Sequence, residues 1–321
     1  MKIAGIDVGS NAIRLIIGER DSLGAIHILD KVREPLRLGK DVFSRGEIRR
    51  KTQDRMIAAF KKFKKVIDHQ QVDFVFAVGT SALREASNGG KVCTEIKMAT
   101  GIDLKAIGGS REAELVHCAI QSKINNELGA IGLIDIGGGS VEVGFSESSV
   151  LKNRQSFPLG TVRLLQIINE NDWNESHLED FLDHEMDKVF KYVDEKAPTL
   201  PIEIAVGTGG NMECMGRLRV VLLKKPSFYE IFTEEVEEIL NHIKNMSIKD
   251  RVQYLRLRPD RADVIFPALC VTHRLLRKMG AKKLCLPNVG LKEGLLYEGF
   301  NLYDRKDDSG ELQEFNSLLN S

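Results

Sequence analysis

Continuous apolar runs and apolar residues at helical spacing alternate along the first half of the chain. Three apolar runs predict consecutive strands over Ile3–Asp7, Ile13–Glu19 and Ile26–Leu38. Apolar positions three and four residues apart then predict a helix over Thr52–His69. The unbroken run Val72–Val78 is typical of a strand buried on both faces, as parallel sheets require. The half closes with a predicted helix over Gly90–Thr100, a strand over Asp103–Ile107 and a helix that begins after an N-cap at Ser110.

The second half restarts the same pattern. Its predicted strands are Ala130–Asp135, Val141–Ser146, Val150–Phe157, Ile202–Val206 and Lys283–Leu286. Its predicted helices are Thr161–Asn169, His177–Ala197, one that follows the turn Gly207–Gly210, Thr233–Asn245, Asp263–Met279 and Leu291–Phe300. Strands that alternate with helices indicate an α/β fold, and the restart indicates two halves of one design.

Two stretches are near-copies of each other, Gly5–Asn11 and Leu133–Glu142. Each is an apolar run that ends in an aspartate, then small residues, then a second apolar run, which predicts a strand, a tight hairpin and a returning strand. Glycine allows close approach of the backbone, so successive N–H groups can converge on an anion. A carboxylate there would repel a bare phosphate, so Asp7 and Asp135 are expected to hold a cation or a water beside one. Two such loops predict duplicated halves that grip a phosphate chain between them.

Composition narrows the class of protein. The 321 residues are enough for two domains, and equal numbers of acidic and basic residues give no net charge to attract DNA or RNA. The five cysteines lack CxxC spacing, which favours reduced thiols over a disulfide frame or a zinc site. No apolar run approaches the length of a membrane span, and the first strand follows Met1 and Lys2 directly, so a cytoplasmic protein without a membrane partner is expected.

The ordered set of motifs resembles the exopolyphosphatase/guanosine pentaphosphate phosphohydrolase (Ppx/GppA) family of the actin/hexokinase/Hsp70 superfamily. The motifs that carry the resemblance are Asp7–Asn11, Arg37–Gly39, Gly79–Ala86, Glu112-Ala113, Asp135–Glu142, Ser156–Gly160, Gly207–Gly210 and Ala262–Val264. The resemblance implies an α/β fold of two duplicated actin-like (ribonuclease H-like) domains with a phosphate-binding cleft between them. The predicted domains are residues 1–124 plus 300–321, and residues 125–299. The chain lacks the extra C-terminal helical domains of longer members, so it is similar to the short form.

The resemblance also assigns acid–base and metal roles. Glu112 matches the glutamate that activates the attacking water, although a carboxylate in a first helical turn is common for its favourable dipole alone. Glu142 faces away from its neighbours Val141 and Val143 and would position the water or a metal; a solvent-facing strand residue is the simpler alternative. Asp7 and Asp135, with Glu142, would hold Mg²⁺ through waters, unless the two aspartates only cap strand ends.

Phosphate binding is assigned in the same way. Backbone N–H groups and short side chains would bind the phosphate at Ser10, Asn11, Gly137, Gly138, Gly139, Ser140, Gly207, Thr208 and Gly209. Arg84, just beyond a parallel strand, would clamp the phosphate that is attacked. Arg14 is expected to be an exposed strand residue.

Nine basic residues against two acidic ones lie between Arg45 and Lys65. They could attract a polyphosphate tail, or form the solvated face of an amphipathic helix.

The resemblance implies a Mg²⁺-dependent hydrolase that removes terminal orthophosphate from inorganic polyphosphate, from guanosine pentaphosphate with release of the tetraphosphate, or from both. The two substrates share one end group, so the motifs do not choose between them. An ATP-dependent kinase of the same superfamily and a non-catalytic alarmone or polyphosphate sensor remain alternatives. Retention of Glu112 and Glu142 argues against the sensor, because binding alone needs no base. A homodimer is expected from the family.

Overall fold

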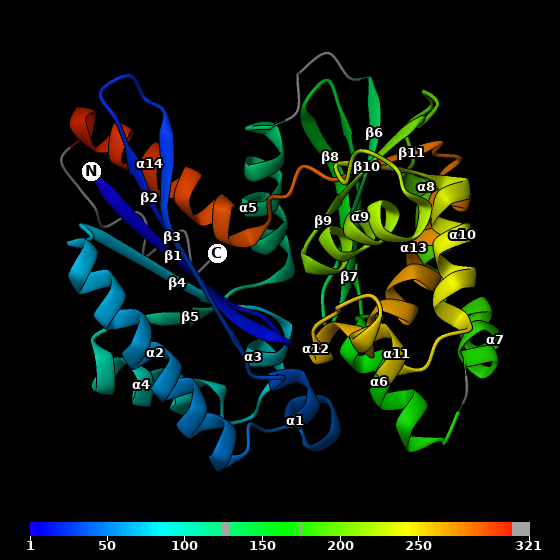
Figure 1. Cartoon of the computed structure of the whole chain (residues 1–321). Coiled ribbons are helices and arrows are strands. Elements are labelled where there is room, and N and C mark those ends of the chain that lie inside the picture. The colour runs from blue at the N-terminus through cyan, green and yellow to red at the C-terminus, as the bar shows by residue number, and fades with distance from the viewer. Residues whose placement is uncertain (124–128, 174, 310–321) are drawn as a thin grey trace. The chain divides into compact units, whose positions relative to one another are not determined.

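The computed structural model describes residues 1–123, 129–173 and 175–309, without the side chains of residues 175, 176 and 305–309 (Figure 1). Contacts between residues divide the chain into two compact units. Unit 1 comprises Met1–Ile120 and Val289–Ser321, and unit 2 comprises Gln121–Asn288. The C-terminal segment thus returns to the unit in which the chain begins.

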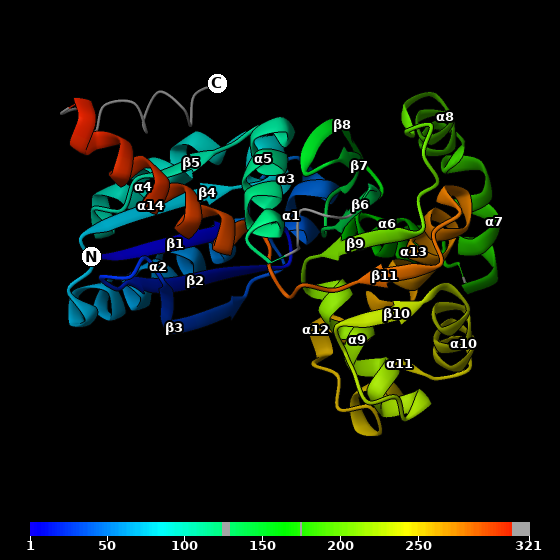
Figure 2. The same ribbon diagram turned by 90° about the horizontal axis from the view of Figure 1, so that it is seen from above.

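Unit 1 contains a five-stranded sheet. Its strands are β1 (Lys2–Val8), β2 (Ala12–Arg20), β3 (Ile26–Pro35), β4 (Phe74–Gly79) and β5 (Leu104–Ala106). The order across the sheet is β3-β2-β1-β4-β5, as Figure 2 shows from above. The first three strands form an antiparallel meander, whereas β4 runs parallel to β1 and β5 parallel to β4. The carboxyl ends of β1, β4 and β5 therefore share one edge, which is where open α/β sheets bind ligands.

Helices cover both faces of this sheet. They are α1 (Leu38–Arg45), α2 (Arg50–Gln70), α3 (Ser81–Glu85), α4 (Gly89–Thr100), α5 (Gly109–Gln121) and α14 (Leu291–Ser309). Figure 1 shows α2 and α4 over one face and α14 over the other. On the α2 face, Phe60 and Phe63 are fully buried among the apolar residues of β1 and β2. Burial of the apolar stripe of α2 thus offsets the loss of conformational entropy when this helix is ordered.

Unit 2 repeats the strand arrangement. Its strands are β6 (Ala130–Ile136), β7 (Val141–Glu147), β8 (Val150–Phe157), β9 (Ile204–Thr208), β10 (Glu230–Phe232) and β11 (Lys283–Cys285). The order is β10-β11-β9-β6-β7-β8, with β6, β7 and β8 antiparallel and β9 parallel to β6. The predicted duplication is therefore confirmed at the level of topology: each unit has a meander followed by a strand parallel to its first strand.

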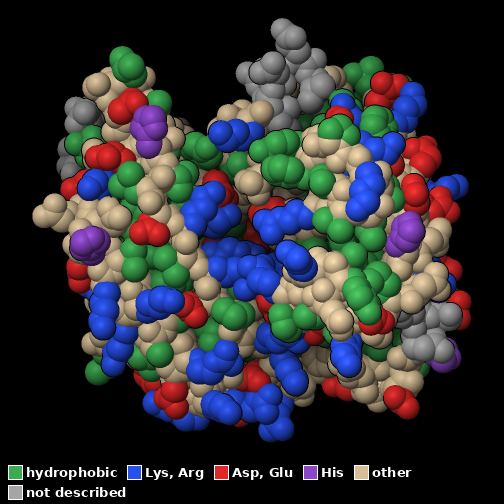
Figure 3. Space-filling view, in the orientation of Figure 1, with side chains coloured by type: hydrophobic (Ala, Val, Ile, Leu, Met, Phe, Trp, Pro, Cys, Tyr) green, Lys and Arg blue, Asp and Glu red, His purple; other side chains and the backbone are tan. Residues whose placement is uncertain are grey.

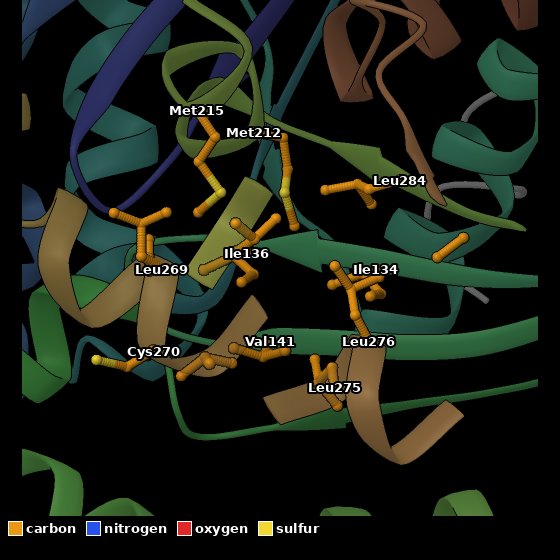
Figure 4. Close-up of a cluster of buried hydrophobic side chains, with 14 of the residues drawn as sticks. Ile134, Ile136, Val141, Met212, Met215, Leu269, Cys270, Leu275, Leu276 and Leu284 are labelled. Carbon is orange, nitrogen blue, oxygen red and sulfur yellow. The ribbon is translucent and has the colours of Figure 1, made fainter. Parts of the chain in front are cut away.

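The helices of unit 2 surround a second core. They are α6 (Thr161–Glu170), α7 (Glu175–Glu185), α8 (Asp187–Lys196), α9 (Gly210–Leu223), α10 (Thr233–Lys244), α11 (Ile248–Gln253), α12 (Pro259–Ala262) and α13 (Ile265–Met279). Helix α13 packs against α6, α8, α9 and α10. Figure 4 shows its Leu275 and Leu276 beside Ile134 and Val141 of the sheet, with Met212 of α9 nearby. No helix in the described part of the chain is both long enough and apolar enough to cross a membrane.

Several predicted boundaries were wrong. The third strand ends at Pro35, and Leu38 already belongs to α1, because Arg37 adopts a left-handed conformation with φ of 54° that turns the chain. Ser110 is not the N-cap of α5, since the helix begins at Gly109 and the carbonyl of Gly108 accepts from the N–H of Glu112. The single helix predicted over His177–Ala197 is two helices, α7 and α8, separated at Met186.

The C-terminal helix is longer than predicted and changes the division of the chain. The prediction ended it at Phe300 and began the last segment of the first domain there. Helix α14 instead runs to Ser309 and packs against β1 and β2, and the whole helix belongs to unit 1. Its close fit is visible at Gly294, where an added Cβ would lie 2.0 Å from the carbonyl oxygen of Leu115.

Candidate functional site

The first glycine hairpin lies at the carboxyl end of β1. Asp7 is buried and pairs across the sheet with Arg14, whose Nη1 donates to Asp7 Oδ2 at 2.8 Å. The turn closes when the N–H of Gly9 donates to the carbonyl of Ala12 at 3.1 Å. A carboxylate in this hairpin therefore has a cationic partner within its own unit. Arg14, predicted to be simply exposed, is half-buried and makes this ion pair.

Ser10 and Asn11, the predicted phosphate-binding residues of this loop, are almost fully buried. The hydroxyls of Ser10 and Ser81 lie 3.0 Å apart, which joins the loop to the start of α3. The carbonyl of Ser10 accepts from the N–H of Gly39, and the carbonyl of Asn11 accepts from the N–H groups of Leu36 and Arg37. These bonds fix the loop on both sides.

Arg84 and Glu112 are each hydrogen-bonded to the connection between β5 and α5, at one edge of the sheet in unit 1. Arg84 follows β4, is exposed, and donates from Nη1 to the carbonyl of Ile107 at 2.7 Å. Ile107 follows β5, and its N–H donates to the carbonyl of Gly79 at 2.9 Å. Glu112 lies in the first turn of α5 and is half-buried. The Ile107-Gly108 connection thus places a guanidinium and a carboxylate at the ends of adjacent parallel strands.

The second hairpin, in unit 2, has two carboxylates where the first has an ion pair. Asp135 on β6 pairs directly with Glu142 on β7. Oε1 of Glu142 accepts from the hydroxyls of Ser140 at 2.6 Å and Ser156 at 2.8 Å, and Oδ2 of Asp135 accepts from Thr208 at 2.7 Å. Burial raises the pKa of Glu142, and the adjacent charge of Asp135 raises this pKa further. Two facing carboxylates of this kind favour a bound cation.

The glycine loop of unit 2 rests on the start of α6. The N–H of Thr161 donates to the carbonyl of Gly137 at 3.0 Å, and that of Val162 donates to the carbonyl of Gly138 at 2.8 Å. The carbonyls of the loop thus face the helix. In contrast, the N–H groups of Gly138 and Gly139 donate to no other residue in the described ranges. Backbone donors of this kind are what an anion-binding loop requires.

Replacing Gly160 by alanine should disrupt this arrangement. An added Cβ would lie 2.2 Å from the carbonyl carbon of Gly139 and 2.3 Å from the nitrogen of Ser140, so the loop or the helix must move. We expect a loss of about 1–3 kcal/mol in the free energy of unfolding, as for other overpacked sites. Urea unfolding measures it. The matched control is Gly90→Ala in α4, where no atom lies within 4 Å of the added Cβ and a slight gain is expected.

The predicted Gly207-Thr208-Gly209 segment divides between core and site. Gly207 lies in β9, and an added Cβ would meet Leu284 and Met212 at 3.0 Å, so the absence of a side chain there serves packing. Thr208 is the hydroxyl partner of Asp135. Gly209 has φ of +87°, and a Cβ added to it would lie 2.9 Å from Oδ1 of Asp135. The strand register pairs Gly207 with Ile134 and Thr208 with Asp135, so all three residues lie beside the second hairpin, and a phosphate-binding role for them stays a prediction.

Two further residues support the second hairpin and were not predicted as site residues. Nδ2 of Asn211 donates to the carbonyl of Ile136 at 3.0 Å, and Nη1 of Arg261 donates to Oδ1 of Asn211 at 2.7 Å. Both side chains are buried. Asn211 directly follows the Gly-rich turn, which is the signal that could have identified it. Arg261 stands 50 residues further along the chain, and only folding brings it to Asn211.

Of the predicted metal ligands, Asp135 and Glu142 suit a hard divalent cation better than Asp7 does. In the described ranges, no group of three or more His, Cys, Asp or Glu side chains is close enough to hold a metal ion together. Asp135 and Glu142 nevertheless present oxygen donors side by side, and Mg²⁺ typically uses one or two carboxylates together with waters and phosphate oxygens. Asp7 fits a cation less well, because Arg14 already balances its charge.

Two units, each with a glycine hairpin after its first strand, define an actin-like fold. The sequence model of the Ppx/GppA phosphatase family matches residues 16–302 of this chain. The chain belongs to this family.

Relatives and solved structures agree with this assignment. The chain is 26% identical to exopolyphosphatase 1 of Mycobacterium tuberculosis, over 100% of this chain and 94% of that protein. It is 24% identical to guanosine-5'-triphosphate,3'-diphosphate pyrophosphatase of Aeromonas hydrophila, over 92% of this chain but 58% of that longer protein. The crystal structure of an exopolyphosphatase from Cytophaga hutchinsonii superimposes with a TM-score of 0.85 and 25% identity, covering 94% of this chain and 98% of that one. The predicted α/β actin-like fold is confirmed.

Proposed function

We propose that this protein is a phosphoanhydride hydrolase that releases terminal orthophosphate from inorganic polyphosphate, from guanosine pentaphosphate, or from both. Membership of the Ppx/GppA phosphatase family and the names of relatives support this activity. The observation that carries it is that Arg84 and the first turn of α5, which holds Glu112, are both hydrogen-bonded to the Ile107-Gly108 connection in unit 1. No relative reported above supports the kinase or the sensor.

The residues of unit 1 supply the parts that hydrolysis needs. The backbone of the Ser10-Asn11 loop would bind oxygens of the terminal phosphate. The guanidinium of Arg84 would hold the same group, since a planar fork matches phosphate oxygens. The carboxylate of Glu112 would accept a proton from the attacking water, while the shortened phosphate chain departs with the electron pair of the broken P–O bond.

The metal proposed for this reaction is Mg²⁺. Asp135 and Glu142 are the residues of unit 2 that would hold it, together with waters. When bound, Mg²⁺ supplies positive charge that offsets the charge on phosphoryl oxygens. Thr208, Ser140 and Ser156 hold the two carboxylates in place through their hydroxyls.

A homodimer and a cytoplasmic location complete the proposal. The homodimer rests on the family resemblance, and the cytoplasmic location rests on the sequence pattern. Light scattering on the eluate of a sizing column would measure the oligomeric state directly.

Orthophosphate release by the purified protein tests the proposed activity. We expect release in Mg²⁺ from long-chain polyphosphate, guanosine pentaphosphate or both, and little from ATP. Running the three substrates in parallel also chooses the preferred one. No orthophosphate release from polyphosphate or guanosine pentaphosphate would rule out the proposal.

A further inference from the structure

A basic pocket of about 570 Å³ lies in unit 1 where the end of β3, helix α1 and the first turns of α2 meet. Its lining includes five cationic side chains, those of Arg37, Lys40, Arg49, Lys51 and Arg55, and the one carboxylate of Asp41. Lysine and arginine side chains gather at the bottom of Figure 3, over α1 and the start of α2. The pocket is therefore strongly positive although the whole chain has no net charge.

The carboxylate of the pocket is occupied by internal contacts. Asp41 is buried, and it accepts from Nε of Arg49 at 2.6 Å and from the hydroxyl of Thr52 at 2.5 Å. Burial would raise the pKa of Asp41, but the hydrogen bonds from Thr52 and Arg49 outweigh burial and leave this pKa lowered. Asp41 thus stays ionised and balances Arg49, without neutralising the rest of the pocket.

The lysines of the pocket remain open to a ligand. Lys40 and Lys51 are exposed, and the amino group of neither forms an ion pair or a hydrogen bond with any residue in the described part of the chain. Arg55 donates to the carbonyl of Pro35 at 2.8 Å, which uses one of its five N–H groups. Several donors therefore point to an anionic ligand that the protein itself does not supply.

The pocket is joined directly to the Ser10-Asn11 loop. Arg37, at its rim, has φ of 54°, a left-handed conformation that is uncommon for a residue other than glycine. The N–H of Arg37 donates to the carbonyl of Asn11, and that of Gly39 donates to the carbonyl of Ser10. Unfavourable backbone conformations that persist often mark functional sites. Here the conformation brings the basic rim against the loop that is proposed to bind the terminal phosphate.

We propose that this pocket binds inner phosphates of an inorganic polyphosphate chain whose terminal phosphate lies at the Ser10-Asn11 loop. The inference rests on the proposed function and names the substrate class that the site favours. A linear chain carries one negative charge or more on every unit, which a row of cations can match. The pocket lining contains no aromatic ring and no amide side chain with which to read a nucleoside base.

Equilibrium binding tests this pocket without turnover. The variant Lys40→Gln/Lys51→Gln removes two exposed charges from the pocket. Titration calorimetry in EDTA would compare its affinity for long-chain polyphosphate and for tripolyphosphate. The matched control is Lys61→Gln/Lys65→Gln, which removes two exposed charges from α2 outside the pocket. We expect the pocket variant to bind the long chain on the order of tenfold more weakly, with tripolyphosphate and the control changed less than about twofold.

Two results would overturn the inference. Equal weakening by the pocket and control variants would mean that only overall charge matters. Unchanged affinity, or equal loss for long and short chains, would mean that the pocket does not take inner phosphates. Because binding is measured apart from turnover, a wild-type protein that binds polyphosphate but releases no orthophosphate would count against the proposed function and not against the pocket.

Discussion

Glu112→Gln should lower kcat by about 10²–10⁴-fold, the usual contribution of a general base, with little change in KM. Glutamine keeps the size of the side chain but cannot accept the proton of the attacking water. Because Glu112 lies in the first turn of α5 near the Arg84 and Ile107 contact, the loss should fall on the chemical step. Orthophosphate release under saturating substrate measures it.

The control for this variant lies on the same helix. Glu114 is exposed and accepts from Nη1 of Arg111 at 2.9 Å, so Glu114→Gln changes the same charge two residues away. This variant should retain nearly full activity, and both proteins should unfold at the wild-type temperature. A Glu112→Gln enzyme with kcat within about threefold of wild type would refute the role of Glu112 as base.

Glu142→Gln should raise the stability of the metal-free protein and abolish its stabilisation by Mg²⁺. The folded state raises the pKa of Glu142, mainly through burial and then through Asp135, so the folded state binds this proton more tightly than the unfolded chain does. Its contribution to stability is therefore present at low pH and is lost as the pH rises from the ordinary glutamate value through the folded pKa. Ionising Glu142 in the metal-free folded protein is therefore unfavourable above the ordinary glutamate pKa, and the glutamine variant removes this cost.

Thermal unfolding in EDTA measures this effect. At about pH 8 the variant should melt roughly 2–4 °C above wild type, and at about pH 5 the difference should shrink. Adding Mg²⁺ should raise the melting temperature of wild type but not that of the variant, and orthophosphate release should fall with the lost cation response. Equal Mg²⁺ stabilisation of both proteins would remove Glu142 from the metal site. A variant less stable than wild type in EDTA at neutral pH would contradict the direction of the pKa argument.

The hairpins could be predicted because their signals are local. Each glycine hairpin needs only a short apolar run, a small-residue turn and a returning run, and these lie within ten residues of one another. The orientation of Glu142 followed from strand alternation in the same way. The pairing of Arg14 with Asp7 could also have been predicted from the duplication. Arg14 stands seven residues after Asp7, as Glu142 stands seven after Asp135, and the register pairs both couples in the same way.

The errors arose where distant residues decide the local structure. Phosphate binding at Gly207 stays a prediction, but the packing of Leu284 and Met212 around this glycine could not be predicted, because only the folded core brings them there. The turn at Arg37 was missed because no glycine marks it, and the bonds to Asn11 that hold it come from another hairpin. The roles of Glu112 and Arg84 depended on family resemblance, since a first-turn carboxylate and a lone arginine are common on any surface.

The return of α14 to unit 1 bears on the order in which the chain acquires structure during synthesis. Residues Gln121–Asn288 form an uninterrupted unit, whereas the unit that begins at Met1 also needs Val289 onward. Until α14 leaves the ribosome, Gly5 and Gly18 of the first hairpin lack the helix that covers them through Lys292 and Leu296. The second-made half can therefore fold before the first-made half is complete, which reverses the usual N-to-C order of domain folding.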